Sequence, residues 1–312
     1  IMGILSWKIL FISFLILIST INLFWMKENY LIGGTDVGNQ LFFQLNFFQN
    51  FKPIINSSSP ALEKICHIII LMSKAMTVSE KCLWWPNFVY FISSLFNLMI
   101  GTSLFASRLS MFPFIFILFF ATYLIARKIA DEKVAFFSVT FLFMYPLISQ
   151  SMKQYNLDFP LTAFVCFSIY LLIQTDYFKN LIYSIFLGII AGIGMNVKGQ
   201  EVLFVFWPIS WMVLYIIFKF LKKEIKCREL GKIGINFFLF LILFSSLSAI
   251  WWGSKGGVPA IFYHLKVYSS EMKYSDNFPP LLKYNRFSLP AIFSHLFALF
   301  FLKEKIIFFE FS

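Results

Sequence analysis

Two acidic residues stand where hydrophobic segments begin or end, and both are candidates for catalysis. Asp36 lies in "LIGGTDVGNQLFFQ", just after the first hydrophobic run, and Asp158 lies in "YNLDFP" at the entrance of another. A carboxylate can take the proton from an attacking hydroxyl group, while cations hold a phosphate group that departs. Residues of these types predict a site where a hydroxyl displaces a phosphate from an activated, lipid-linked substrate.

Other polar residues accompany the two carboxylates at comparable positions. They are Arg108, Lys153, Tyr155, Lys198 and Glu201. Ionisable groups at membrane depth are costly, and they are therefore functional candidates. The basic members of the set are the candidates for holding phosphate.

Each of these residues also has a structural interpretation. Asp158 is a suitable N-cap for the helix that follows it, with Pro160 in the first turn. Asp36 follows two glycines and a threonine, and it suits an Asx turn. Lys198 and Arg108 are long enough to reach lipid head groups from a buried backbone. Capping does not exclude catalysis, so both interpretations stay open.

The composition is that of an integral membrane protein. The chain has 312 residues, of which 59% are hydrophobic and only 13% are charged, too few for the surface of a soluble domain. The formal net charge of +11 is typical of cytoplasmic loops and contacts with anionic lipids, and does not indicate nucleic-acid binding. The cysteines and histidines lack the spacing of metal ligands, so we predict no cofactor and leave a divalent metal open.

The hydrophobic runs predict a single membrane domain, residues 1–312, with an all-α fold of about eight transmembrane helices. The predicted spans are Ile9–Trp25, Leu109–Ile125, Val134–Met152, Phe159–Thr175, Asn180–Val197, Val202–Phe218, Ile233–Ser254 and the shorter Phe287–Leu302. The glycines of "GIIAGIG" suit close packing between helices. These glycines are Gly188, Gly192 and Gly194.

A ninth segment, Trp84–Ser107, is long enough to cross a membrane but has a different pattern. Polar or small residues recur along it at helical spacing. They are Tyr90, Ser93, Ser94, Asn97 and Gly101. One polar stripe on an apolar helix favours a helix that lies in the membrane interface.

The distribution of basic residues predicts the orientation. The loops 127–133, 176–179 and 219–232 are rich in lysine and arginine, whereas the short loops on the opposite side contain only Lys153 and Lys198. The positive-inside rule places the first set in the cytoplasm. With eight spans, the segments outside are 26–107, 153–158, 198–201 and 255–286, so Asp36 and Asp158 face the same compartment.

The order of these features resembles the polytopic, lipid-phosphate-dependent glycosyltransferases of the C-type fold. The resemblance is to the bacterial branch related to protein O-mannosyltransferases and the aminoarabinose transferase of lipid A. Three stretches carry it, within a region of roughly Ile9 to Phe218. They are "VYFISSLFNLMIGTSLFASRLSMF", "YPLISQSMKQYNLDFPLTAFVCFSIYLL" and "LGIIAGIGMNVKGQEVLFVFWP".

The resemblance implies roles for individual residues. Asp36 matches the position of the family's catalytic base, although many members have two adjacent acidic residues where this chain has "TDVGNQ". Asp158 matches an active-site aspartate, and Arg108 and Lys198 match basic positions. His264 lies in a loop that resembles one over the active site. Members usually continue through more spans, so we expect that this chain is incomplete at one or both ends.

Together these observations predict a multi-pass glycosyltransferase of the cytoplasmic membrane, with its active site facing outside. It would pass a sugar from a polyprenyl-phosphate donor to a lipid, glycan or protein acceptor and invert the anomeric configuration. Asp36 and Asp158 would be catalytic, and Lys198, Arg108 and Lys153 would bind the donor phosphate. Contacts with acceptor or sugar would come from Tyr155, Glu201 and His264.

Two other functions remain open at the level of sequence. One is a transporter or flippase for a polyprenyl-linked glycan, which would bind the same phosphate without cleaving it. We find no internal repeat of the kind that transporters show, and the long first outer loop with its acid favours catalysis. The other is a membrane partner without catalytic activity.

Overall fold

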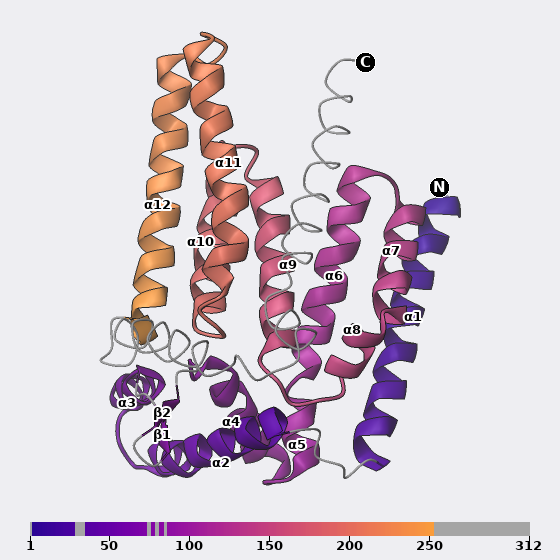
Figure 1. Cartoon of the computed structure of the whole chain (residues 1–312), viewed down its shortest axis with the longest axis vertical. Helices are drawn as coiled ribbons and strands as arrows, with labels where there is room; N and C mark the ends of the chain where they lie inside the picture. Colours follow the sequence, from indigo (N-terminus) through magenta and orange to yellow (C-terminus); the bar gives the residue numbers. More distant parts are fainter. Residues whose placement is uncertain (1, 29–34, 74–75, 79–80, 84–85, 253–312) are drawn as a thin grey trace, which may run out of the picture. The chain divides into compact units, whose positions relative to one another are not determined.

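The computed structural model describes residues 2–28, 35–73, 76–78, 81–83 and 86–252, all within one compact unit. One group of helices runs in a common direction, as Figure 1 shows. Its members are α1 (Met2–Glu28), α6 (Phe112–Ile129), α7 (Glu132–Met144), α9 (Asp158–Gln174), α10 (Leu181–Met195), α11 (Glu201–Leu221) and α12 (Cys227–Trp252). These helices form the bundle.

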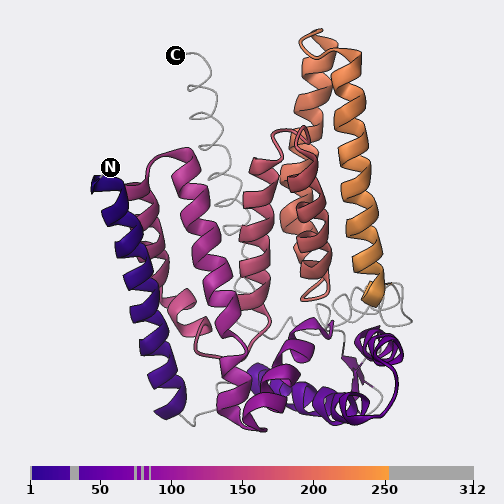
Figure 2. The ribbon, with the colours of Figure 1, turned by 180° about the vertical axis from the view of Figure 1, so that it is seen from behind.

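A second group lies at one end of the bundle. In both views α2 and α4 run across the direction of the bundle helices (Figures 1 and 2). The elements of this transverse layer are α2 (Thr35–Asn56), α3 (Ala61–Ser73), α4 (Phe88–Ile100), the short α5 (Leu104–Leu109), and the strands β1 (Met76–Val78) and β2 (Lys81–Leu83). The strands pair antiparallel. The short helix α8 (Pro146–Ser151) connects α7 to the turn before α9.

The helix lengths agree with a multi-pass membrane protein. Among the residues that the structure describes, four helical segments are long and apolar enough to cross a membrane, at Trp7–Glu28, Leu104–Ile129 (α5 and α6 together), Glu201–Leu221 and Cys227–Ile250. Two other predicted spans correspond to the shorter apolar helices α9 and α10. The predicted span Phe287–Leu302 lies outside the described residues, so the total of eight remains a prediction.

The predicted span Val134–Met152 is not one continuous helix. Helix α7 ends at Met144, the backbone of Tyr145 is extended, and Pro146 begins α8. The pyrrolidine ring disfavours the helical conformation of the preceding residue, whereas proline is well tolerated in a first helical turn. Pro146 therefore explains why the helix breaks at Tyr145.

Helix α4 corresponds to the segment for which we predicted an interfacial helix. It has 13 residues, and at 1.5 Å per residue it is too short for a hydrocarbon core of about 30 Å. Its polar stripe has a different environment from the one we predicted, because Tyr90, Ser93, Ser94 and Asn97 are all buried in the protein. The exposed side of α4 carries Met99, which is apolar.

Helix α2, which forms much of the transverse layer, was not predicted from the sequence. Three phenylalanines on α2, Phe43, Phe47 and Phe51, recur every fourth residue and are buried. Gln40 and Gln44 share this spacing and are also buried. Aromatic and amide side chains on one face indicate a helix that packs against protein, and this period was the available signal.

Helices α10 and α12 pack closely through two of the three predicted glycines. A Cβ atom added at Gly188 would lie 2.8 Å from the carbonyl oxygen of Phe240, and one at Gly192 would lie 2.8 Å from Cβ of Leu247. The close-packing prediction is therefore confirmed for these two positions. Gly194 instead leaves room for Glu201 of the following helix, whose carboxyl carbon would be 2.6 Å from an added Cβ.

The loops rich in lysine and arginine lie at the end of the bundle opposite the transverse layer (Figure 2). Ion pairs occur there between Arg127 and Glu132, at 3.5 Å, and between Lys179 and Glu229, at 3.0 Å. The three basic loops therefore lie together at one end of the bundle, and the membrane orientation that we predicted from them stays a prediction.

Candidate active site

Asp158 and Lys198, both predicted from sequence, form an ion pair at the start of α9. Lys198 Nζ donates to Asp158 Oδ1 across 40 positions of sequence. The lysine side chain is only 12% exposed, whereas the aspartate side chain is 70% exposed. A nearly buried ammonium group needs a carboxylate close by, and Asp158 supplies one.

The interpretation of Asp158 as an N-cap is wrong. The amide of Phe159 donates to Oδ1 of Asn156 at 3.0 Å, so Asn156 satisfies this group at the start of α9. Asp158 lies within the first turn and makes no such bond. Its carboxylate near the positive end of the helix is electrostatically favoured and pairs with Lys198.

Arg108 and Lys153 contact the same aromatic ring. The guanidinium carbon of Arg108 lies 5.3 Å from the ring centroid of Trp25, and Nζ of Lys153 lies 5.4 Å from it. Arg108 is 1% exposed, so its side chain does not extend to the surface as the snorkelling interpretation requires. Trp25 was not among the predicted residues, because a single tryptophan near a helix end resembles an interfacial anchor.

A chain of buried hydroxyl groups connects the turn before α9 to the transverse layer. Ser93 Oγ donates to the Tyr155 hydroxyl at 2.9 Å and shares a hydrogen bond of 2.6 Å with Ser110 Oγ. Ser110 donates to the carbonyl of Ser107, whose hydroxyl donates to Gln44 Oε1 at 2.9 Å. This chain joins α2, α4 and α5 to the turn that carries Lys153 and Asp158.

Tyr155 is fully buried in this network. Burial raises the pKa of its phenol above the ordinary value, so the group stays protonated. The predicted contact between Tyr155 and acceptor or sugar stays a prediction, and the observed contact is with Ser93.

The turn between α10 and α11 is fixed by bonds to its neighbours. The side-chain amide of Asn196 donates to the carbonyl of Leu247 at 2.8 Å, which ties the turn to α12. The carbonyl of Asn196 accepts from the amide of Phe88 at 3.3 Å, which ties it to α4. Lys198, two residues further on, is therefore presented to Asp158 from a turn that is held on two sides.

Glu201 begins α11 and is fully buried. Its Oε1 accepts from Ser168 Oγ of α9 at 3.1 Å, in the space that Gly194 leaves. The carboxyl group of Glu201 on α11 thus bonds to Ser168 of α9 and packs against Gly194 of α10, close to the turn that carries Lys198. Its predicted contact with acceptor or sugar also stays a prediction.

The structure describes no side-chain contacts for the two remaining predicted residues, Asp36 and His264. Asp36 lies in the first turn of α2, one helical turn before Gln40, and its side chain is outside what the structure describes. His264 lies outside the described residues. In the part of the chain that is described, no group of three His, Cys, Asp or Glu residues is arranged to hold a metal ion.

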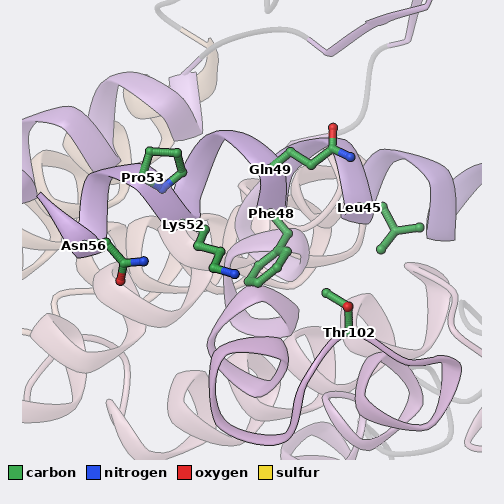
Figure 3. Close-up of a pocket in the computed structure, with 7 residues that line it drawn as sticks. All are labelled: Leu45, Phe48, Gln49, Lys52, Pro53, Asn56 and Thr102. Carbon is green, nitrogen blue, oxygen red and sulfur yellow. The ribbon is translucent and has the colours of Figure 1, made fainter.

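A groove of about 520 Å³ runs between α2 and the turn that leads to α5 (Figure 3). Its lining is apolar and amide-rich with a single cation. The lining residues are Leu45, Phe48, Gln49, Lys52, Pro53, Asn56 and Thr102. None of the predicted site residues contributes to this groove. The candidate site is therefore defined by the Asp158–Lys198 ion pair and by Arg108 and Lys153, the two cations that contact Trp25.

Comparison with known families identifies a relationship over much of the chain. Residues 85–251 match the model of a family described as dolichyl-phosphate-mannose-protein mannosyltransferase. The match includes Arg108, Lys153, Asp158 and Lys198 and does not extend to Asp36. No curated protein and no solved structure matches the chain. Because the match covers more than half of the sequence, the chain belongs to this mannosyltransferase family, and it is a multi-pass membrane glycosyltransferase.

Proposed function

We propose that the protein transfers a sugar from a polyprenyl-phosphate donor to an acceptor hydroxyl group outside the cytoplasmic membrane. The acceptor is a lipid, a glycan or a protein, and the anomeric configuration is inverted by direct attack. The observation that carries this proposal is that four of the predicted site residues, Arg108, Lys153, Asp158 and Lys198, lie within the stretch that matches the family. The Asp158–Lys198 pair and the two cations on Trp25 are joined through the short turn 153–158.

The charges at this end suit the departing phosphate. Arg108, Lys153 and Lys198 supply three formal positive charges, and Asp158 supplies one negative charge. A net positive site stabilises the negative charge that develops as the phosphate leaves. Such stabilisation is typically worth about 3 kcal/mol for each well-placed group.

Asp36 is the proposed base. It would take the proton of the acceptor hydroxyl as the oxygen forms a bond to the anomeric carbon. The bond between that carbon and the phosphate oxygen breaks, and the electron pair leaves with the phosphate. Asp158 would orient the acceptor or share the base role while it holds Lys198.

The outward orientation is supported by charge. The basic loops with Arg127, Lys179 and their neighbours lie at the end of the bundle opposite α2 and α4 (Figure 1). Loops of this kind are retained in the cytoplasm. The candidate site would then face outside, where a lipid-linked sugar meets its acceptor.

The experiment that tests this function is transfer of labelled sugar from a synthetic polyprenyl-phosphate donor in membranes. We expect Asp36→Asn to abolish transfer without reducing the amount of folded protein, because the amide cannot accept the proton. Asp176→Asn is the matched control, since Asp176 is exposed in a loop at the basic end.

The possible results separate the candidate functions. Full turnover by Asp36→Asn would remove Asp36 as the base. Donor that is bound by the wild type and the variant but cleaved by neither would favour the transporter or the inactive partner.

A further inference from the structure

Trp25 occupies a position that its sequence context does not explain. It lies near the end of α1, where Asn22 and Met26 are buried, so one face of this part of the helix packs against protein. Helix α1 packs there against α5, the helix that carries Arg108. The indole of Trp25 is half-buried and lies beneath two cations from different elements.

The shared ring limits how far apart these cations can be. Arg108 is 5.3 Å and Lys153 is 5.4 Å from one ring centroid, so their separation is no greater than these two distances combined. Two like charges at such a distance repel each other, most strongly where water is scarce. The negative face of an indole attracts cations within about 6 Å, which offsets part of this repulsion.

The two cations are held in different ways. Arg108 is fully buried, and it lies between Ser107 and Ser110 of the buried hydroxyl chain. Lys153 lies in a turn and is partly exposed. The ring therefore contacts both the more exposed cation, Lys153, and the buried one, Arg108.

We propose that Trp25 is a positioning residue that holds Arg108 and Lys153 together as one binding site for the phosphate of the polyprenyl donor. This inference rests on the proposed function. Neither cation alone defines a site, but two cations on one ring match a group with several charged oxygens. Trp25 acts through the cations and does not itself react.

The test measures KM for the synthetic sugar donor and kcat separately, with the full chain in membranes. We expect Trp25→Ala to raise KM about tenfold while kcat changes less than about twofold. Trp25→Phe should recover part of the affinity, because its ring attracts cations more weakly than indole does. Trp207→Ala is the matched control, since Trp207 is 63% exposed on α11.

A second variant guards against misfolding. Fluorinated tryptophan at position 25 keeps the shape of the ring and withdraws electron density from its face, so KM should rise with each added fluorine. An unchanged KM across this series would overturn the proposal, and so would equal donor affinity in Trp25→Ala and the wild type.

Binding of polyprenyl phosphate without sugar separates this inference from the proposed function. If the wild type binds this lipid but transfers no sugar, and Trp25→Ala binds it about tenfold more weakly, the phosphate site stands and the transferase assignment fails. If transfer occurs and the Trp25 variants bind and turn over normally, the assignment stands and the role of Trp25 fails.

Discussion

The contact between α10 and α12 differs from the transverse layer in what holds it together. At Gly188 and Gly192 the backbones of α10 and α12 approach so closely that a methyl group would not fit. In the layer, by contrast, α2, α4 and α5 are joined by hydroxyl and amide groups such as Ser93, Ser110 and Gln44. The first contact leaves no room for a side chain at its two glycine positions, whereas the second adds a network of polar side chains to its buried aromatic residues.

The two regions also differ in how they relate to the predicted site residues. Close packing needs only small residues at the right spacing. A buried polar group is costly unless each partner is in place, so a polar network fixes the elements that it joins. The elements joined here carry Arg108, Lys153 and Asp158, whereas the glycine contact carries none of the predicted site residues.

The largest expected effect is on the packed region. Gly188→Val places a branched side chain where even Cβ would lie 2.8 Å from Phe240 O and 3.0 Å from Leu243 Cβ. We expect the free energy of unfolding to fall by about 2–3 kcal/mol, with loss of transfer in proportion to loss of folded protein. Thermal unfolding followed by size-exclusion chromatography in detergent measures this. Gly234→Val is the control, since its Cβ would meet nothing within 4 Å, and an equal loss in both would contradict the packing argument.

The next largest effect separates catalysis from stability. Lys198→Ala removes a cation that is 12% exposed and paired with Asp158, and we expect transfer to fall about 100-fold. The folded fraction should change little, because the turn is still held by Asn196. The double variant Asp158→Lys with Lys198→Asp keeps two opposite charges but exchanges the positions of the cation and the carboxylate. Full transfer by this double variant would show that the pair is only structural.

The all-helical membrane fold and several residues of the candidate site were predicted from the sequence. The long spans followed from uncharged runs, and both members of the Asp158–Lys198 pair were identified. Their contact was not, because the two residues are 40 positions apart and no local pattern couples them. Trp25 was missed for the same reason, since its contacts are with cations from two other elements, Arg108 and Lys153.

The α4 stripe shows a different limit of sequence analysis. Its helical spacing was correct, but spacing alone does not say whether the polar face meets water or protein. In the structure the Tyr90 hydroxyl donates to Gln40 of α2, and the Ser93 hydroxyl donates to Tyr155. Helix α2 was not anticipated as a partner, because its mixed aromatic and amide composition resembles neither a span nor a loop. Whether the polar face of α4 meets water or protein depends on which element packs against it.

The smallest expected effect is at the basic end of the bundle. The ion pair between Lys179 and Glu229 has a short N–O distance of 3.0 Å, but the two side chains are 42% and 40% exposed. Exposed pairs of this kind contribute less than about 1 kcal/mol, and salt screens them further. Lys179→Ala should therefore lower the unfolding free energy by less than about 1 kcal/mol, measured in low and high salt.

The backbone explains why this pair is dispensable. The buried side chain of Asn236 donates to the carbonyls of Phe178 and Lys179 at 2.8 and 3.2 Å, and both bonds survive the loss of the lysine side chain. Asn236→Ala removes them and should destabilise more, by about 1–3 kcal/mol. Neither variant reaches the candidate site, so turnover per folded molecule should stay at the wild-type level. A loss of turnover in Lys179→Ala as large as that in Lys198→Ala would remove the distinction between the two ends.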